Sequence, residues 1–291
     1  RENKARLAAY IAEQNGVNVD PDSIFDVQVK RLHEYKRQLL NVLHILYIYR
    51  YLKVHPEADY PARTFIFGAK ASSGYDLAKE IISLIVAVSE LLNADPVTRD
   101  RLKVVFIEDY RVSLAELIIP AAEISEQISV AGKEASGTSN MKLMINGAVT
   151  LGTMDGANVE ICEQVGEDNM FLFGMNVEQV NALWQKGYHP KEYIEADPEL
   201  KAVIDMLTSG ELGRRFDGIA ASLLTSRYGA ADQYMTLADF ADYKRAQALI
   251  SKTYADKYAF LGKSLTNIAK AGVFSADRSV LEYAKNIWGM I

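Results

Sequence analysis

A cluster of basic residues follows the first predicted strand of this 291-residue chain. Lys30 and Arg31 leave the strand, while Lys36 and Arg37 stand in the first turn of the helix predicted next, with Glu34 between them. Cations at the amino end of a helix oppose the helix dipole, so the helix by itself disfavours them. A bound phosphate would offset that repulsion. The cluster therefore indicates a phosphate site, with a solvated basic edge as the alternative.

The second candidate is a loop of small residues at 132–140, which precedes a helix predicted at 141–147. Small side chains let backbone N–H groups approach an anion closely at a helix start, and Thr138 or Ser139 can cap that helix. Lys142 follows in the first turn. We expect it to be partly buried beside the positive helix end, because both conditions favour the uncharged amine that imine formation needs. A surface lysine is the alternative.

Two further loops give weaker indications. Tyr110, in the loop at 108–111, could face a flat cofactor with Arg111 as a nearby charge, although a turn with a half-buried tyrosine fits as well. The turn at 152–158 could line a pocket. The sequence contains neither G-x-G-x-x-G nor G-x-x-x-x-G-K-[ST], so dinucleotide and P-loop nucleotide sites lose their main support.

Alternating strand and helix patterns must position these loops. The fold class predicted from this alternation is α/β, a Rossmann-like parallel sheet with helices on both faces and a helical C-terminal tail. We expect three parts, at 1–22, 23–175 and 176–291. The predicted strands are 24–29, 64–68, 102–107, 124–130, 148–151 and 170–174. The predicted helices are 1–14, 34–54, 75–93, 113–121, 141–147, 177–186, 193–207, 237–259, 263–271 and 278–288.

Composition excludes several classes of protein. Hydrophobic residues make up 49% and charged residues 24% of the chain, which is typical of a globular protein. The net charge of −6 argues against nucleic-acid binding. A single cysteine, Cys162, fits a reducing, cytoplasmic location. With four histidines and no HExxH or CxxC pattern, we expect no metal site, and no apolar stretch is long enough to span a membrane.

Several long runs resemble the α-glucan phosphorylases, the family of glycogen, starch and maltodextrin phosphorylases. The runs are 25–40, which includes the basic cluster, 131–142, which includes the small-residue loop, 147–160, 274–278 and 283–288. The resemblance covers essentially the whole chain. It matches only the C-terminal portion of family members, the second half of a glycosyltransferase-B architecture. The chain also opens in what is predicted to be the middle of a helix, so we expect it to be a fragment of a longer protein.

The resemblance implies a role for each candidate residue. Lys142 would form the Schiff base with pyridoxal 5′-phosphate, and Tyr110 would contact the cofactor ring. The residues expected to hold the cofactor phosphate are Lys30, Thr138 and Ser139. The residues expected to act in catalysis beside the reacting phosphates are Lys30, Arg31 and Lys36, of which Arg31 and Lys36 would hold the substrate phosphate. The residues expected to bind hydroxyl groups of the glucose unit are Glu134, Ser136 and Gly137.

The reaction implied by the resemblance is reversible phosphorolysis of an α-1,4-glucan, which releases glucose 1-phosphate. The expected partners are the glucan, inorganic phosphate, glucose 1-phosphate and the missing N-terminal domain, and the parent enzyme is expected to be a homodimer. We expect the isolated chain to be inactive, because in the family the site lies between two domains. A sugar-nucleotide glycosyltransferase of the same fold and a non-catalytic sugar- or phosphate-binding fragment are the alternatives.

Overall fold

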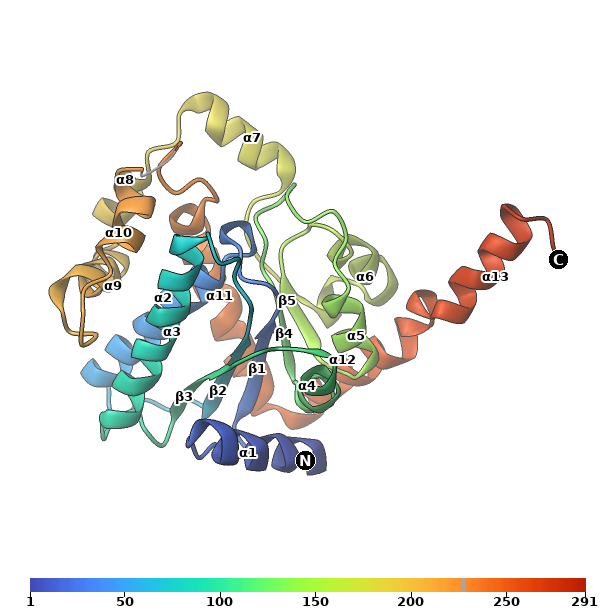
Figure 1. Ribbon diagram of the computed structural model, residues 1–291, viewed down its shortest axis with the longest axis horizontal. Helices are drawn as coiled ribbons and strands as arrows, with labels where there is room; N and C mark the ends of the chain where they lie inside the picture. Colours follow the sequence, from blue (N-terminus) through green and yellow to red (C-terminus); the bar gives the residue numbers. More distant parts are fainter. Residues whose placement is uncertain (227–228) are drawn as a thin grey trace.

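A six-stranded parallel sheet forms the centre of the protein (Figure 1). The computed structural model describes residues 1–226 and 229–291. The predicted α/β class and parallel sheet are confirmed. The strands are β1 (Ile24–Val29), β2 (Arg63–Gly68), β3 (Leu102–Ile107), β4 (Ile124–Gln127), β5 (Val149–Gly152) and β6 (Phe171–Leu172).

The strand order is β3-β2-β1-β4-β5-β6. The chain builds the sheet outward from β1 to β3, then returns to place β4 on the other side of β1. In such an open sheet the connections on the two sides of this reversal diverge, which leaves a crevice at the carboxyl ends of the two central strands. Here that crevice lies beyond Val29 of β1 and Gln127 of β4.

Helices cover both faces of the sheet, as predicted. One core cluster joins β1, β2 and β3 to helices formed by residues 38–54, 76–94, 198–209, 217–224 and 236–255, through residues such as Phe65, Leu84 and Phe240. The second core cluster, on the opposite face, joins Phe25 and Ile66 to helices formed by residues 2–15, 112–118 and 139–145. The helices up to residue 165 are α1 (Glu2–Asn15), α2 (Gln38–Val54), α3 (Asp76–Ala94), α4 (Val112–Ile118), α5 (Ser139–Ile145) and α6 (Asn158–Val165).

The described residues after β6 form helices and turns, so the helical C-terminal region is confirmed. These helices are α7 (Val177–Lys186), α8 (Pro190–Ala196), α9 (Pro198–Ser209), α10 (Asp217–Leu224), α11 (Thr236–Ala255), α12 (Lys257–Lys270) and α13 (Ala276–Asn286). The helices α9, α10 and α11 share one core with the sheet. The domain boundary predicted between residues 175 and 176 stays a prediction. Within the described part of the chain, none of the helices combines the length and apolar character that a membrane span requires.

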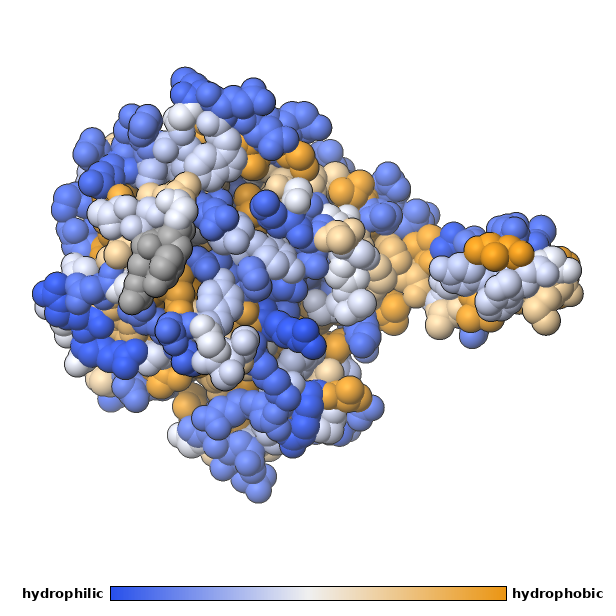
Figure 2. Space-filling model, turned by 45° about the horizontal axis from the view of Figure 1, so that its top comes forward, coloured by the Kyte–Doolittle hydropathy of each residue, from blue (hydrophilic) through white to orange (hydrophobic). Residues whose placement is uncertain are grey.

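The last helix, α13, projects away from the rest of the molecule (Figure 1). It has no buried residue. The space-filling view shows apolar patches along this projection (Figure 2). Its exposed large apolar side chains are Val280, Leu281, Tyr283, Ile287, Trp288, Met290 and Ile291.

Some predicted element boundaries are wrong. The helix predicted at 34–54 is a short 3₁₀ helix at Glu34–Lys36 followed by α2, because Arg37 between them has a left-handed backbone with φ 54°. Asp197 and Asp256 each cap a new helix, which divides the helices predicted at 193–207 and 237–259. The strand predicted at 124–130 ends at Gln127. The helices α6 and α10 were not predicted.

Candidate active site

A pocket of about 540 Å³ lies at the crevice between the carboxyl ends of β1 and β4. Three loops line it, those that follow β1, β3 and β4. The ten residues to which the resemblance assigns a role are all in its lining, and the structure brings them together from positions more than a hundred residues apart. The lining residues are Val29, Lys30, Arg31, Lys36, Tyr110, Arg111, Val112, Ala115, Glu134, Ser136, Gly137, Thr138, Ser139 and Lys142.

Lys30 stands directly at the end of β1, where its ammonium group donates a hydrogen bond of 2.8 Å to Oε1 of Gln127. Burial and, to a smaller extent, the positive charge of Lys36 lower the pKa of Lys30 to about 8, against opposing contributions from Glu134 and Glu126. The hydrogen-bond partner of this half-buried ammonium group is a neutral amide. An anion in the pocket would therefore stabilise the charged form of Lys30, which burial disfavours.

This lowered pKa predicts a pH dependence of anion binding. Lys30 loses its proton progressively as the pH rises through about 8, and with it one of the charges that attract an anion. We expect the affinity for sulfate, which does not titrate in this range, to fall by up to about tenfold between pH 8 and pH 9, since Arg31 and Lys36 stay in the pocket. Isothermal titration calorimetry between pH 7 and 9.5 measures this. The Lys30→Arg variant keeps its charge and should show a flat profile. A flat profile in the parent chain would contradict the prediction.

Lys36 and Glu134 form an ion pair across the pocket, with 3.1 Å between Nζ and Oε2. Both side chains are mostly buried, at 17% and 18% exposure. Lys36, expected to hold phosphate, and Glu134, expected to bind the sugar, therefore neutralise each other. Arg31 is exposed beside them, so its guanidinium group is accessible to an incoming anion.

Arg37, the fourth cation of the basic cluster, is not part of the pocket. Its side chain is fully buried and pairs with Asp239 at 2.6 Å. It also donates hydrogen bonds to the carbonyl groups of Ile128 and Ser129, at 2.7 and 3.3 Å. Of the two residues expected in a helical first turn, Lys36 lies in the short 3₁₀ helix Glu34–Lys36, whereas the expectation is wrong for Arg37, whose backbone is left-handed and separates this turn from α2.

Lys142 extends from α5 and is exposed, so the partial burial that we expected for it is wrong. Thr138 occupies the N-cap position of α5, but its side chain makes no capping hydrogen bond. Ser139 accepts a long hydrogen bond of 3.4 Å from the amide of Gln127. The start of α5 thus faces the end of β4 across the crevice.

Tyr110 reaches the pocket because the neighbouring strand ends in glycine. A Cβ atom at Gly68 would lie 3.1 Å from Cγ1 of Val29 and 3.4 Å from the Tyr110 side chain. Gly68 therefore lets the tyrosine lie close against the end of β2. Burial raises the pKa of the Tyr110 hydroxyl.

Gln127 and Asp155 belong to the architecture of the site, and the sequence did not identify them. Gln127 is 4% exposed and bonds both Lys30 and Ser139. Its position as the last residue of a strand beside the sheet reversal could have indicated it, once the strand order was known. Asp155 lies in the turn at 152–158, which the sequence suggested only as a possible pocket lining. In the structure Asp155 is not in the lining and lies behind the loop of Gly132 and Glu134.

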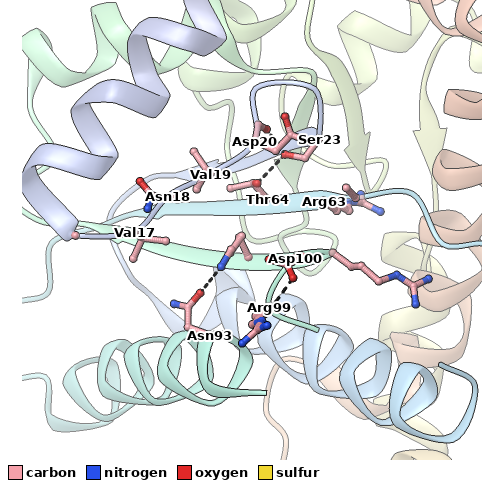
Figure 3. A pocket seen from close by; sticks show the side chains of 14 residues that line it. Val17, Asn18, Val19, Asp20, Ser23, Arg63, Thr64, Asn93, Arg99 and Asp100 are labelled. Atoms are coloured by element: carbon pink, nitrogen blue, oxygen red, sulfur yellow. Dashed lines mark hydrogen bonds and ion pairs between the residues drawn. The ribbon is translucent and has the colours of Figure 1, made fainter. Parts of the chain in front are cut away.

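A larger pocket of about 610 Å³ lies at the opposite, amino ends of β1, β2 and β3 (Figure 3). It contains none of the ten candidate residues. Several of its polar groups already bond one another: Ser23 with Thr64 at 2.8 Å, Lys103 with Asn93 at 2.7 Å and Arg99 with Asp100 at 3.5 Å. Ligands in open parallel sheets bind at the carboxyl ends of the strands, so the smaller pocket is the better candidate.

Comparison with known proteins shows the family of this chain. The family model described as carbohydrate phosphorylase matches residues 1–290. The chain belongs to the carbohydrate phosphorylase family. This family consists of glycosyltransferase-type enzymes, and the resemblance seen in the sequence is thereby confirmed.

Several mammalian proteins are similar over the whole chain. Glycogen phosphorylase, muscle form, is 48% identical in Bos taurus and 47% identical in Homo sapiens, over 290 residues that make up 100% of this chain and 34% of each relative. Glycogen phosphorylase, brain form, from Ovis aries is 47% identical over 293 residues, 99% of this chain. The chain spans about a third of the length of these relatives.

Proposed function

We propose that this chain forms the cofactor and phosphate half of an α-1,4-glucan phosphorylase. The observation that supports this most directly is the pocket at the sheet reversal, where Lys30, Arg31 and Lys36 converge on the loop of Lys142. The parent enzyme would act in the cytoplasm as a homodimer, together with an N-terminal domain that the longer relatives suggest.

The residues present fit pyridoxal phosphate. Lys30 is a half-buried cation whose hydrogen-bond partner is neutral, which suits a phosphate group. Tyr110, set close by Gly68, offers a flat surface for a ring, and Lys142 offers an exposed amine for covalent attachment. When bound, the cofactor would supply a phosphate group able to exchange a proton with the substrate phosphate.

In the proposed reaction the bond between C1 of a terminal glucose and the glycosidic oxygen breaks, and C1 bonds to an oxygen of inorganic phosphate. The proton of that phosphate passes to the departing glucan oxygen. Arg31 and Lys36 would hold the substrate phosphate, and the cations together would offset the repulsion between two phosphates at close range. They would also stabilise the ion pair between phosphate and an oxocarbenium-like sugar. Glu134, Ser136 and Gly137 would orient the glucose unit through its hydroxyl groups.

Binding of two ligands tests this function against the sugar-nucleotide alternative. We expect α-glucose 1-phosphate to bind the chain loaded with pyridoxal phosphate at least tenfold more tightly than uridine diphosphate glucose does, as measured by calorimetry. The reverse preference would favour a sugar-nucleotide glycosyltransferase. Equal affinity for glucose 1-phosphate in the parent and in a Lys30→Ala, Lys36→Ala double variant would contradict the proposed site.

The isolated chain should bind without turning over. Arg31 and Lys142 are exposed, so the pocket as it stands does not exclude water from the reacting groups. We expect no release of phosphate from glucose 1-phosphate with a maltooligosaccharide acceptor, in a coupled phosphate assay with the purified chain. Measurable, Lys30-dependent release would show that this part of the protein is sufficient for catalysis.

A further inference from the structure

The loop after β5 lies directly behind the pocket loop and bonds it at several points. Asp155 is 7% exposed and uses both carboxylate oxygens. Oδ1 accepts a hydrogen bond of 2.9 Å from the backbone N–H of Gly132. Oδ2 accepts bonds from the backbone N–H of Glu134 at 2.9 Å and from the Ser129 hydroxyl at 3.0 Å. One carboxylate thus joins three points of the segment that connects β4 to α5.

The contact continues through the next two residues. Gly156 has a φ of +53°, and a Cβ atom there would lie 2.6 Å from the carbonyl oxygen of Ser136 and 3.0 Å from that of Glu134. The backbone N–H of Ala157 donates to the same Ser136 carbonyl at 2.8 Å. The two loops therefore lie backbone against backbone, with no room for a side chain between them.

The pocket loop depends on these bonds for much of its shape. Because residues 128–138 form neither helix nor strand, no regular ladder satisfies their N–H groups. Val130 donates to the carbonyl of Tyr35 and Lys133 to that of Val130, whereas Gly132 and Glu134 donate to Asp155. Buried N–H groups left without an acceptor are costly, so the loop should rearrange if Asp155 is changed.

Asp155 itself does not line the pocket. Its acceptors hold the backbone at Glu134, whose side chain extends forward to Lys36. The neighbouring Ser136 is held by Ala157. The cations Lys30 and Arg31, in contrast, come from the loop after β1, which Asp155 does not contact. A change at Asp155 should therefore disturb one side of the pocket and leave the other in place.

We propose that Asp155 is a positioning residue for the sugar-binding side of the pocket: its carboxylate holds the loop of Glu134, Ser136 and Gly137 in the shape that receives a hexose, and does not contribute to anion binding by Lys30 and Arg31. This inference rests on the proposed function.

The Asp155→Asn variant tests this role, because it keeps the size of the side chain and replaces one acceptor oxygen with an NH₂ group. That group cannot accept a bond from Gly132 or from Glu134. We expect at least tenfold weaker binding of glucose 1-phosphate, sulfate binding within twofold of the parent chain, and faster hydrogen exchange at the amides of Gly132 and Glu134. Calorimetry and exchange mass spectrometry measure these quantities.

Ser129→Ala is the matched control, since it removes one donor to Asp155 and leaves both backbone bonds intact; its affinity for glucose 1-phosphate should change less than threefold. Gly156→Ala is the second variant, because its Cβ atom would push against the same loop. It should also weaken the binding of glucose 1-phosphate and leave the binding of sulfate unchanged. If neither Asp155→Asn nor Gly156→Ala folds, as judged by circular dichroism, the proposal is overturned, since the turn would then serve the whole fold.

The outcomes separate this inference from the function on which it rests. Unchanged affinity for glucose 1-phosphate in Asp155→Asn, with faster exchange at the two amides, would overturn the role of Asp155 alone. Equal losses of glucose 1-phosphate and sulfate would also overturn it. If the parent chain binds sulfate but not glucose 1-phosphate at millimolar concentrations, the proposed function fails, and the role of Asp155 fails with it.

Discussion

Replacing Lys142 by alanine should abolish specific attachment of pyridoxal phosphate to this chain. Lys142 is exposed and shares its pocket with the cations Lys30, Arg31 and Lys36. A cofactor held by its phosphate would keep its aldehyde beside this one amine, which raises the effective concentration there far above that at other lysines. The expected result in the parent chain is a single modified peptide, that of Lys142, after mixing, borohydride reduction and mass mapping. The Lys142→Ala variant should yield none.

A matched control comes from the same segment. Lys133 is also exposed and lies nine residues before Lys142, but it does not line the pocket. Lys133→Ala should therefore leave the modification of Lys142 unchanged. Labelling spread over many lysines in the parent chain, or an unchanged absorbance spectrum in Lys142→Ala, would mean that this pocket does not select the cofactor.

Replacing Asp239 by alanine should destabilise the fold by about 3–5 kcal/mol. Asp239 Oδ2 lies 2.6 Å from Nη1 of Arg37, and the two side chains are 3% and 0% exposed. Without Asp239, the Arg37 charge would stay buried with only carbonyl partners at Ile128 and Ser129. The change also removes an acceptor for the backbone N–H of Met175. Urea unfolding followed by circular dichroism measures the loss.

Asp205→Ala provides the comparison for this stability change. Asp205 pairs with Lys201 at the same distance of 2.6 Å, but the two side chains are 61% and 57% exposed. Solvent screens such a pair, so its removal should cost about 0–1 kcal/mol. Equal losses in the two variants would show that burial does not determine the importance of the Arg37 pair.

Much of the architecture could be predicted from local pattern. The segment 24–29 alternates apolar and polar residues and the segment 102–107 is mostly apolar; both patterns predict strands from their own sequence, and both strands are confirmed with these bounds. Two helices, α6 and α10, were missed. They are eight residues each, and α6 follows a turn motif that local pattern does not separate from the helix start.

The chemistry of single side chains was harder to predict. Arg37 stands beside Lys36 in the sequence and has the same charge, yet one side chain is buried against Asp239, 202 residues away, and the other faces the pocket. Local sequence does not distinguish these two environments. For Lys142 the sequence neighbours suggested partial burial, but the side chain is exposed. Its exposure depends on how the rest of the fold packs around α5, which the local sequence does not indicate.

The sequence by itself determined the α/β class, the family and the set of ten candidate residues, because helix and strand periodicity and family motifs are properties of contiguous residues. Only the tertiary structure decided that these residues share one pocket, that Arg37 does not belong to it, and that Gln127 and Asp155 stand behind it. The physical reason is that the strand order β3-β2-β1-β4-β5-β6 brings together loops that are distant in sequence. Burial lowers the pKa of Lys30 and makes loss of the Arg37 ion pair costly. These side chains become buried only when the chain folds and brings the loops together.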